Sequence, residues 1–435
     1  MDWFLFDRVM KSLSEVIAAG RQRVHCTKNH DTVAIEHNLP PPAFPGSLSD
    51  QPEHVAAVST PRFDWNDHAL RDYLFENGYV VVKGIAAPHE IETARDLFWK
   101  FLRDKAGMEP EDPATWTNEN FTKVGSIPTG IVGGAGFGQS EFMWYMRTLP
   151  KVEQLFQLVF RTANSKEVLP QSQSQHMLTS FDGGNIFRPW QRADLLPACT
   201  SSGWYHVDQG KHTKGLQCVQ GMITLTSVNA YTGGLCVIPK SHMQHDLLVD
   251  NTPTAVEDFV RAPPNFPALQ GSQILPTCDA GDMILWDSRT LHCSTHSLCA
   301  TTPVPAAANS IPIPTLTTTV AGTASALGTS ATAATLTNAT MAQVQVQAQV
   351  PLAKPPFDRL LRMAAYVSMT PRSFIPAENL QMVIEKRIQA YQLNMTTNHW
   401  PHKATYIIPS NRPVVNDINS ASQEKKRLIG CISIG

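Results

Sequence analysis

Short runs of β-type residues after residue 175 constrain the fold of this chain more than any other feature of its sequence. The clearest runs span 177–181, 216–226, 235–238, 283–286 and 363–369. Gly233, Gly234 and Pro239 mark turns between them, and no long helical pattern alternates with these runs. Because strands that alternate with helices favour a parallel sheet, the pattern found here predicts an antiparallel sandwich or jelly roll instead.

Helical periodicity frames the β-type runs on both sides. A short helix is predicted over 67–75 with Gly78 as its stop, followed by a strand at 79–84. Apolar residues at helical spacing predict further helices around 91–102, 149–161 and 380–391. The sequence therefore predicts a mainly β fold with flanking helices.

The domain organisation follows from changes in composition along the chain. Residues 1–64 read as an N-terminal helix and an irregular lead-in rich in Pro and His, and residues 65–435 as one domain. The stretch 299–353 consists largely of Ala, Thr, Val, Pro and Gln and has no acidic residue. Such a stretch has few large apolar side chains whose burial could offset the conformational entropy lost on ordering, so we expect a disordered insertion. A β-prone linker that pairs locally is the alternative.

Two segments carry weaker signals. The glycines of 133–138 do not have the spacing of a phosphate-binding loop, and we expect a flexible loop there. The charged cluster 424–427 is interpreted as a solvated tail.

Net charge, cysteine spacing and hydropathy limit the kinds of partner and the cellular compartment expected for this chain. The formal net charge is −2 and no long basic run occurs, which argues against nucleic acid. The eight cysteines are scattered without a C-x-x-C pair, as in an intracellular protein with reduced thiols. No apolar stretch of ~20 residues predicts a membrane span, and acidic residues near the N-terminus argue against a targeting peptide. We expect a cytoplasmic protein that acts on a small molecule, and the sequence predicts no oligomeric state.

The strongest chemical signal is a His-x-Asp tripeptide in an aromatic setting. In an extended strand His206 and Asp208 point to the same face, and His292 is the best third ligand from elsewhere in the chain. Two histidines and one carboxylate on one side of a metal suit non-haem Fe(II) and O2 chemistry. The tripeptide alone is expected about once by chance in a chain with 15 histidines, and other histidines compete as the third ligand. These competitors are His212, His242, His245 and His296.

Three blocks in order make a more specific pattern: 203–209 (GWYHVDQ), 233–242 (GGLCVIPKSH) and 281–292 (GDMILWDSRTLH). Together they resemble the phytanoyl-CoA dioxygenase family, and 76–82 (ENGYVVV) resembles the start of its domain. The resemblance covers about 65–300 and 355–400. It implies a double-stranded β-helix (jelly-roll or cupin-like) core and an oxygenase that uses Fe(II), 2-oxoglutarate and O2. Carried over by position, His206, Asp208 and His292 would be the iron ligands.

The resemblance also implies residues that bind 2-oxoglutarate. Arg362 fits the family's arginine on the strand after the distal histidine, and Arg359 is its nearest competitor. A planar guanidinium suits this task because it can bind a carboxylate bidentately. Asn185 resembles the family's polar residue before the iron strand, and Thr224 and Ser294 are possible further contacts. Each of these three side chains could instead satisfy hydrogen bonds of a turn or strand.

The reaction expected from the resemblance is hydroxylation of a small organic or acyl substrate with release of succinate and CO2. Related halogenases lack the carboxylate ligand, whereas Asp208 is present here. One alternative is a non-catalytic metal-binding jelly roll, and another is a zinc-dependent hydrolase with the same triad. Some acyl-CoA members of the family are peroxisomal, but no clean peroxisomal signal occurs. The sequence predicts neither the substrate nor whether it is a CoA ester.

Overall fold

The computed structural model describes residues 55–161, 176–189, 203–252, 258–298, 359–403 and 414–432. The predicted N-terminal helix, most of the predicted lead-in and the predicted insertion at 299–353 lie outside these residues. The division into domains stays a prediction. The end of the predicted irregular lead-in is more regular than expected, because residues 56–58 and 62–63 form short strands that pair with residues 274–276 and 81–82.

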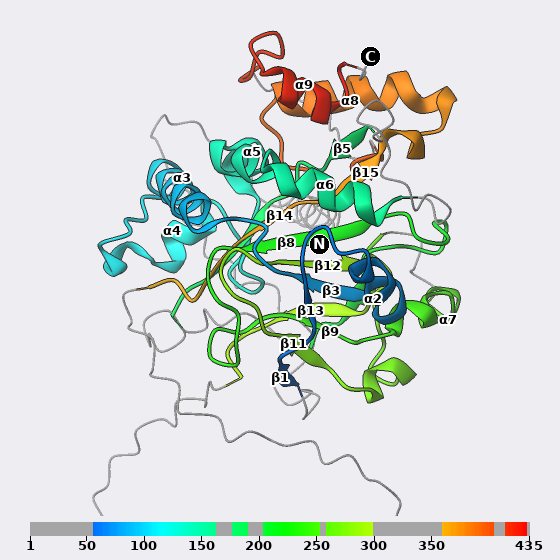
Figure 1. Ribbon diagram of the computed structural model, residues 1–435. Helices are drawn as coiled ribbons and strands as arrows, with labels where there is room; N and C mark the ends of the chain where they lie inside the picture. The colour runs from blue at the N-terminus through cyan, green and yellow to red at the C-terminus, as the bar shows by residue number, and fades with distance from the viewer. Residues whose placement is uncertain are drawn as a thin grey trace, which may run out of the picture. The chain divides into compact units, whose positions relative to one another are not determined.

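Two β-sheets form the centre of the fold (Figure 1). The larger has the order β2 (Arg62–Phe63), β3 (Tyr79–Val82), β12 (Met283–Asp287), β8 (Val219–Thr224), β14 (Arg362–Tyr366), β6 (Gly184–Phe187), β4 (Ile131–Val132). The smaller has the order β1 (Ala56–Val58), β11 (Ile274–Pro276), β9 (Gly234–Val237), β13 (His292–Thr295), β7 (His206–Val207), β10 (Val260–Arg261). A separate pair joins β15 (Met369–Pro371) to β5 (Met177–Thr179). Among the described strands, only the pairs β1–β11 and β2–β3 are parallel.

The side chains of the larger sheet alternate between two cores. One set packs with β7, β9, β11 and β13 of the smaller sheet, namely Tyr79, Val81, Met222, Ile284, Trp286 and Ala364. The other set packs against helices, namely Val80, Val82, Val219, Ile223, Met283, Leu285, Met363 and Ala365. Because successive side chains point to opposite faces, strands buried on both faces read as continuous apolar runs. The two facing sheets confirm the predicted jelly-roll core with flanking helices.

The described helices are α2 (Ala69–Asn77), α3 (Pro88–Ala106), α4 (Asn118–Thr122), α5 (Glu141–Arg147), α6 (Pro150–Val159), α7 (His245–Asp250), α8 (Leu380–Gln392) and α9 (Gln423–Ile429). Helices α3, α5 and α6 pack on the outer face of the larger sheet, whereas Leu248 and Val249 of α7 belong to the core shared with the smaller sheet. Figure 1 shows α8 and α9 together at the C-terminal end of the described chain.

The helices predicted at 67–75, 91–102, 149–161 and 380–391 are confirmed as α2, α3, α6 and α8. Gly78 ends α2 in a left-handed conformation (φ 80°), as its position predicted. A side chain there would also meet His242 and Thr290 at 2.6 Å.

The structure corrects three predictions. The glycines of 133–138 do not form a flexible loop but run into a packed 3-10 turn, η3 (Gly134–Gln139), where a Cβ on Gly138 would lie 2.2 Å from the carbonyl oxygen of Phe181. The cluster 424–427 is not a solvated tail but part of α9, which Ser422 caps and which buries Leu428 and Ile429. The run 363–369 divides between β14 and β15.

Arg387 ties the C-terminal helices to the rest of the fold. It is buried on α8, and its guanidinium donates to the carbonyl oxygens of Ile429 (2.8 Å), Leu428 (3.0 Å), Pro401 (2.7 Å) and Thr179 (2.7 Å). Burial lowers its pKa to about 9. One side chain thus satisfies backbone carbonyl oxygens at the end of α9, in the loop that contains Pro401 and in β5.

We expect Arg387→Leu to lower the free energy of unfolding by about 3–5 kcal/mol, because four buried carbonyl oxygens would lose their donor. Denaturant-induced unfolding of the full chain measures the change. The exposed Glu378, which lies just before α8, provides the control, since Glu378→Ala should change stability by less than about 0.5 kcal/mol. Equal effects of the two substitutions would contradict the role given to Arg387.

Candidate metal centre

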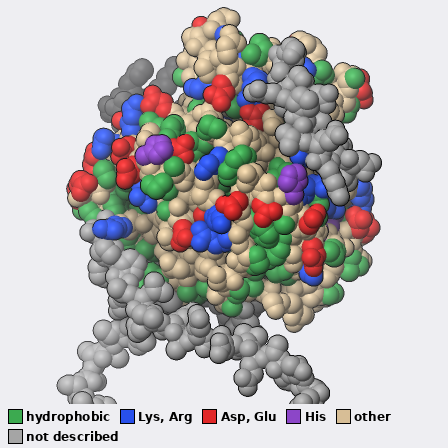
Figure 2. Space-filling view, in the orientation of Figure 1, with side chains coloured by type: hydrophobic (Ala, Val, Ile, Leu, Met, Phe, Trp, Pro, Cys, Tyr) green, Lys and Arg blue, Asp and Glu red, His purple; other side chains and the backbone are tan. Residues whose placement is uncertain are grey.

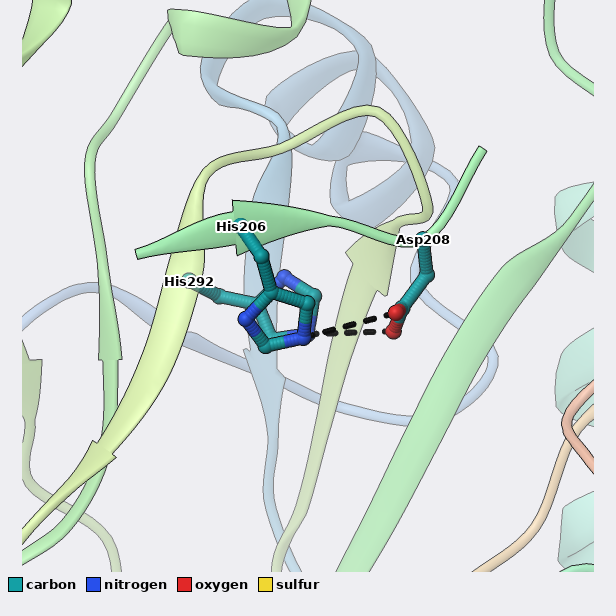
Figure 3. A group of neighbouring side chains, drawn as sticks. All are labelled: His206, Asp208 and His292. Atoms are coloured by element: carbon teal, nitrogen blue, oxygen red, sulfur yellow. Dashed lines mark ion pairs between the residues drawn. The ribbon is translucent and has the colours of Figure 1, made fainter. Parts of the chain in front are cut away.

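The pairing of β7 with β13 brings two histidines together. His206 on β7 is the direct cross-strand partner of His292 on β13, and both side chains point between the sheets (Figure 3). Asp208 follows β7, and its backbone N–H donates to the carbonyl oxygen of Ser288 at 2.8 Å. This bond joins the end of β7 to the turn that precedes β13.

The three side chains have the separations of donors around one ion. His206 Nε2 lies 3.4 Å from Asp208 Oδ1, and His292 Nε2 lies 3.2 Å from Asp208 Oδ2. One donor atom from each residue lies within 4.8 Å of the others, and all three residues are buried. Two donors about 2.1 Å from one ion and at right angles lie about 3 Å apart. The arrangement can therefore hold a divalent metal through three ligand atoms.

Hydrogen bonds orient each of these ligand candidates. The Nδ1 of His206 lies 3.3 Å from the carbonyl oxygen of Trp204, and the Nδ1 of His292 lies 2.9 Å from that of Thr290. An Nδ1–H that donates to a carbonyl leaves the Nε2 lone pair free for a metal. Gln220 Nε2 donates to Asp208 Oδ2 at 2.8 Å.

The protonation states suit metal binding. Burial, together with the neighbouring His292, lowers the pKa of His206 to about 4, although Asp208 opposes the shift. Burial alone would raise the pKa of Asp208, but His206 and His292 hold that pKa well below its ordinary value. A neutral imidazole and an ionised carboxylate are the forms that bind a divalent cation.

Sequence reasoning missed two residues that support the centre. Gln220 lies on β8 of the larger sheet and reaches Asp208 across the space between the sheets. His399, in the loop after α8, is buried, and its Nε2 lies 3.2 Å from the carbonyl oxygen of Asp208. Gln220 could have been found from the alternation within the run 216–226. No local signal marks His399, because its contact is purely tertiary.

Arg362 is a fully buried guanidinium without an acidic partner. Its Nη2 contacts Met222 Sδ, and its guanidinium lies 4.8 Å from the centre of the Phe187 ring. Its Nε and Nη1 have no hydrogen-bond partner among the described residues. Burial lowers its pKa. Because an unpaired buried charge is costly, this guanidinium fits an anion bound between the sheets. Arg359, its competitor, is exposed.

The three weaker candidates differ in their surroundings. Asn185 pairs with Ala364 in the larger sheet and donates to the Thr129 carbonyl oxygen at 3.1 Å, while its own Oδ1 has no partner among the residues that the structure describes. Asn185 and Ser294 both interact with the Tyr366 hydroxyl. Thr224, by contrast, donates to the carbonyl oxygen of Thr226 within its own turn.

The competing histidines lie apart from the centre. His242 and His245 are within 3.0 Å of the carbonyl oxygens of Phe75 and Gln209, respectively, through Nε2. His212 is exposed. Within the described ranges, the group of His206, Asp208 and His292 is the only one of three or more metal-binding side chains with this spacing. The same ranges contain no helix long and apolar enough to cross a membrane.

Comparisons with known proteins give one family. Residues 74–298 match the family model of phytanoyl-CoA dioxygenase (PhyH). A similar curated protein is Ava biosynthesis cluster protein O of Aspergillus versicolor, which is 26% identical over 263 residues, covering 57% of this chain and 77% of that protein.

Two solved structures illustrate the structural likeness. The epimerase SnoN in complex with Fe3+, alpha ketoglutarate and nogalamycin RO has a TM-score of 0.36 and 16% identity, over 53% of this chain and 77% of SnoN. EctD from S. alaskensis with 2-oxoglutarate and 5-hydroxyectoine has a TM-score of 0.35 and 14% identity, over 56% of this chain and 75% of EctD.

Because Gln220 holds Asp208 in place, we expect Gln220→Ala to weaken binding of a divalent metal by about 10- to 100-fold. Anaerobic titration of the full chain with Fe(II) measures the affinity. Gln217→Ala is the matched control, since Gln217 donates to the Lys214 carbonyl oxygen and makes no contact with the triad. Unchanged metal affinity in Gln220→Ala would contradict this role.

Proposed function

The chain belongs to the phytanoyl-CoA dioxygenase family, and from this premise we propose that it is an Fe(II)- and 2-oxoglutarate-dependent dioxygenase that hydroxylates a small organic substrate, releasing succinate and CO2. The observation that carries the proposal is the combination of two features between the same two sheets. One is the His-Asp-His triad, which Gln220 on β8 contacts through Asp208. The other is the buried guanidinium of Arg362, which has no acidic partner among the described residues and contacts Met222, two residues further along β8.

The residues present fit the metal and the co-substrate. His206, Asp208 and His292 would hold Fe(II) on one face. When bound, Fe(II) and 2-oxoglutarate supply O2 activation coupled to oxidative decarboxylation of the co-substrate. Gln220 and the carbonyl oxygens of Trp204 and Thr290 keep the three ligands in one orientation.

Arg362 would bind the far carboxylate of 2-oxoglutarate. Its Nε and Nη1 are the donors that the described residues leave unused, and Phe187 and Met222 shield the guanidinium from water. In such surroundings a charge-assisted hydrogen bond is stronger than in water. Asn185 and Ser294, beside the Tyr366 hydroxyl, are further candidates for contact with the co-substrate.

The alternatives account for less of the site. A zinc-dependent hydrolase or a non-catalytic metal-binding protein could use the triad, but either would leave the buried charge of Arg362 unexplained. Asp208 occupies the ligand position that a halide would need, which favours hydroxylation over halogenation. The name of the similar Ava protein refers to a biosynthesis cluster, which supports a small organic substrate.

One face of the molecule bears on whether the substrate could be a coenzyme A ester. On the face seen in Figure 2, acidic and basic side chains are interspersed and no broad basic patch stands out. A phosphate-rich group is bound best where positive charges gather. This face therefore offers no broad basic surface for the phosphates of a coenzyme A ester.

The direct test is turnover of 2-oxoglutarate. We expect the purified full chain with Fe(II) and O2 to convert 2-oxoglutarate into succinate, faster in the presence of a metabolite extract, and N-oxalylglycine to inhibit the reaction. Asp208→Ala should abolish it. Iron-dependent succinate formation that survives Asp208→Ala would show that the ligand assignment is wrong. Metal-dependent hydrolysis that N-oxalylglycine leaves unchanged would favour the hydrolase.

Arg362→Met separates binding of the co-substrate from binding of the metal. Loss of a charge-assisted, bidentate partner should raise the half-saturating 2-oxoglutarate concentration by about 10- to 100-fold, while the Fe(II) affinity stays within about threefold. Arg359→Met removes the exposed arginine three residues earlier and should change neither quantity. Equal responses of the two variants would exclude Arg362 as the 2-oxoglutarate residue.

A further inference from the structure

A partly buried ion pair joins Lys403, in the loop after α8, to Asp258, two residues before β10. Lys403 Nζ donates to Oδ1 (3.3 Å) and Oδ2 (3.2 Å) of Asp258 and to Thr213 Oγ1 (3.1 Å). The two charged side chains are 23% and 19% exposed, and the ammonium group lies 3.5 Å from the centre of the Trp400 ring. Water and salt screen a partly buried pair less than an exposed one, so this contact holds its two segments together.

Asp258 also holds the turn that follows Asp208 of the triad. Its Oδ1 accepts a hydrogen bond from the backbone N–H of Gly210 at 3.3 Å. The turn closes on itself, since the backbone N–H of Thr213 donates to the carbonyl oxygen of Gly210 at 3.1 Å. Asp258 and Lys403 therefore contact both ends of a turn that begins two residues after Asp208.

The residue after Asp258 packs on a second member of the triad. The ring centre of Phe259 lies 4.5 Å from that of His206. Strand β10 then pairs with β7, where Arg261 is the cross-strand partner of His206. Fixing the Asp258 carboxylate thus fixes the start of a segment that contacts the imidazole of His206.

The loop after α8 reaches the triad from another part of the chain. His399 Nε2 lies 3.2 Å from the carbonyl oxygen of Asp208, and the carbonyl oxygen of His399 accepts a hydrogen bond from Cys218 Sγ at 3.4 Å. The ring centres of His399 and Trp400 lie 4.9 Å apart, and Trp400 also contacts Lys403. Lys403 thus anchors the loop through which His399 contacts Asp208.

The ion pair therefore links two segments that each touch the triad. Segment 258–261 contacts His206, and segment 399–403 contacts Asp208. A metal ion dissociates when its ligands separate, so groups that restrain the ligands slow its release. Because the further hydrogen bonds of the pair go to the turn after Asp208, this restraint would act through the backbone.

We propose that Asp258 and Lys403 are positioning residues, whose ion pair keeps the metal in the triad by holding segments 258–261 and 399–403 against His206 and Asp208. The proposal rests on the proposed function, because it concerns the metal of the same centre. It adds that retention of this metal depends on a contact outside the ligand set.

Release of the metal tests the proposal. The full chain is loaded anaerobically with Fe(II) alone, and transfer of Fe(II) to an excess of ferrozine is followed by absorbance. We expect Lys403→Met to raise the rate of release at least about tenfold, because residues that orient metal ligands contribute this much to metal binding. Asp258→Asn removes the charge but keeps an acceptor for the Gly210 N–H, and it should also speed release.

The double variant and a matched control separate this role from a general effect on the fold. Lys403→Met and Asp258→Asn together should exceed the larger single effect by no more than about threefold, since the two residues act as a unit. Arg427 on α9 pairs with Glu153 on α6, and these side chains are 22% and 16% exposed, close to the values for Lys403 and Asp258. Arg427→Met therefore removes an ion pair of the same kind between two helices, and it should leave the release rate within about twofold of the native rate.

Three outcomes are decisive. A release rate in Lys403→Met that stays at the native value, or that rises equally in Arg427→Met, overturns the proposal, because the pair would then act on the fold alone. If Lys403→Met fails to fold, Asp258→Asn decides by the same criterion. Failure of the native chain to bind Fe(II) would instead contradict the proposed function.

Discussion

The register of β7 against β13 is the constraint on which the rest of the site depends. It places His206 opposite His292, and Asp208, one residue beyond β7, is tied by its backbone to the turn before β13. Because side chains alternate with a period of two, a shift of one residue would turn either imidazole away from the space between the sheets. The three ligand candidates are therefore set by backbone pairing before any metal binds.

The larger sheet supplies the complementary half of the site. Gln220 on β8 reaches across to Asp208, and Arg362 on β14 lies with Met222 and Phe187 on the same inner side. The outer face of this sheet is covered by helices, so its strands are buried on both faces and hold these polar groups rigidly. The loop after α8 adds His399, which contacts the backbone of Asp208. The candidate site is therefore built from both sheets and from the loop after α8.

The sequence predicted the elements whose signal is local. The long apolar runs correspond to strands β3, β8 and β12, and the apolar residues at helical spacing correspond to helices α3, α6 and α8. The short strands β6 and β13 were missed because inward-facing polar residues such as Asn185 and His292 interrupt their apolar pattern. Helix α9 was missed because its charged residues 424–427 precede the two apolar residues that it buries, Leu428 and Ile429. The triad was proposed from motif order, whereas His399 is linked to it by a tertiary contact that no short pattern encodes.

The central claim is that the triad and Arg362 together form one site for Fe(II) and 2-oxoglutarate. Anaerobic calorimetric titration of the full chain with 2-oxoglutarate, with and without Fe(II), tests it most directly. We predict that each chain binds one molecule of 2-oxoglutarate, and that tight binding requires Fe(II) because the metal and the guanidinium hold opposite ends of the molecule. No binding in the presence of Fe(II), or equal affinity in its absence, would contradict the claim.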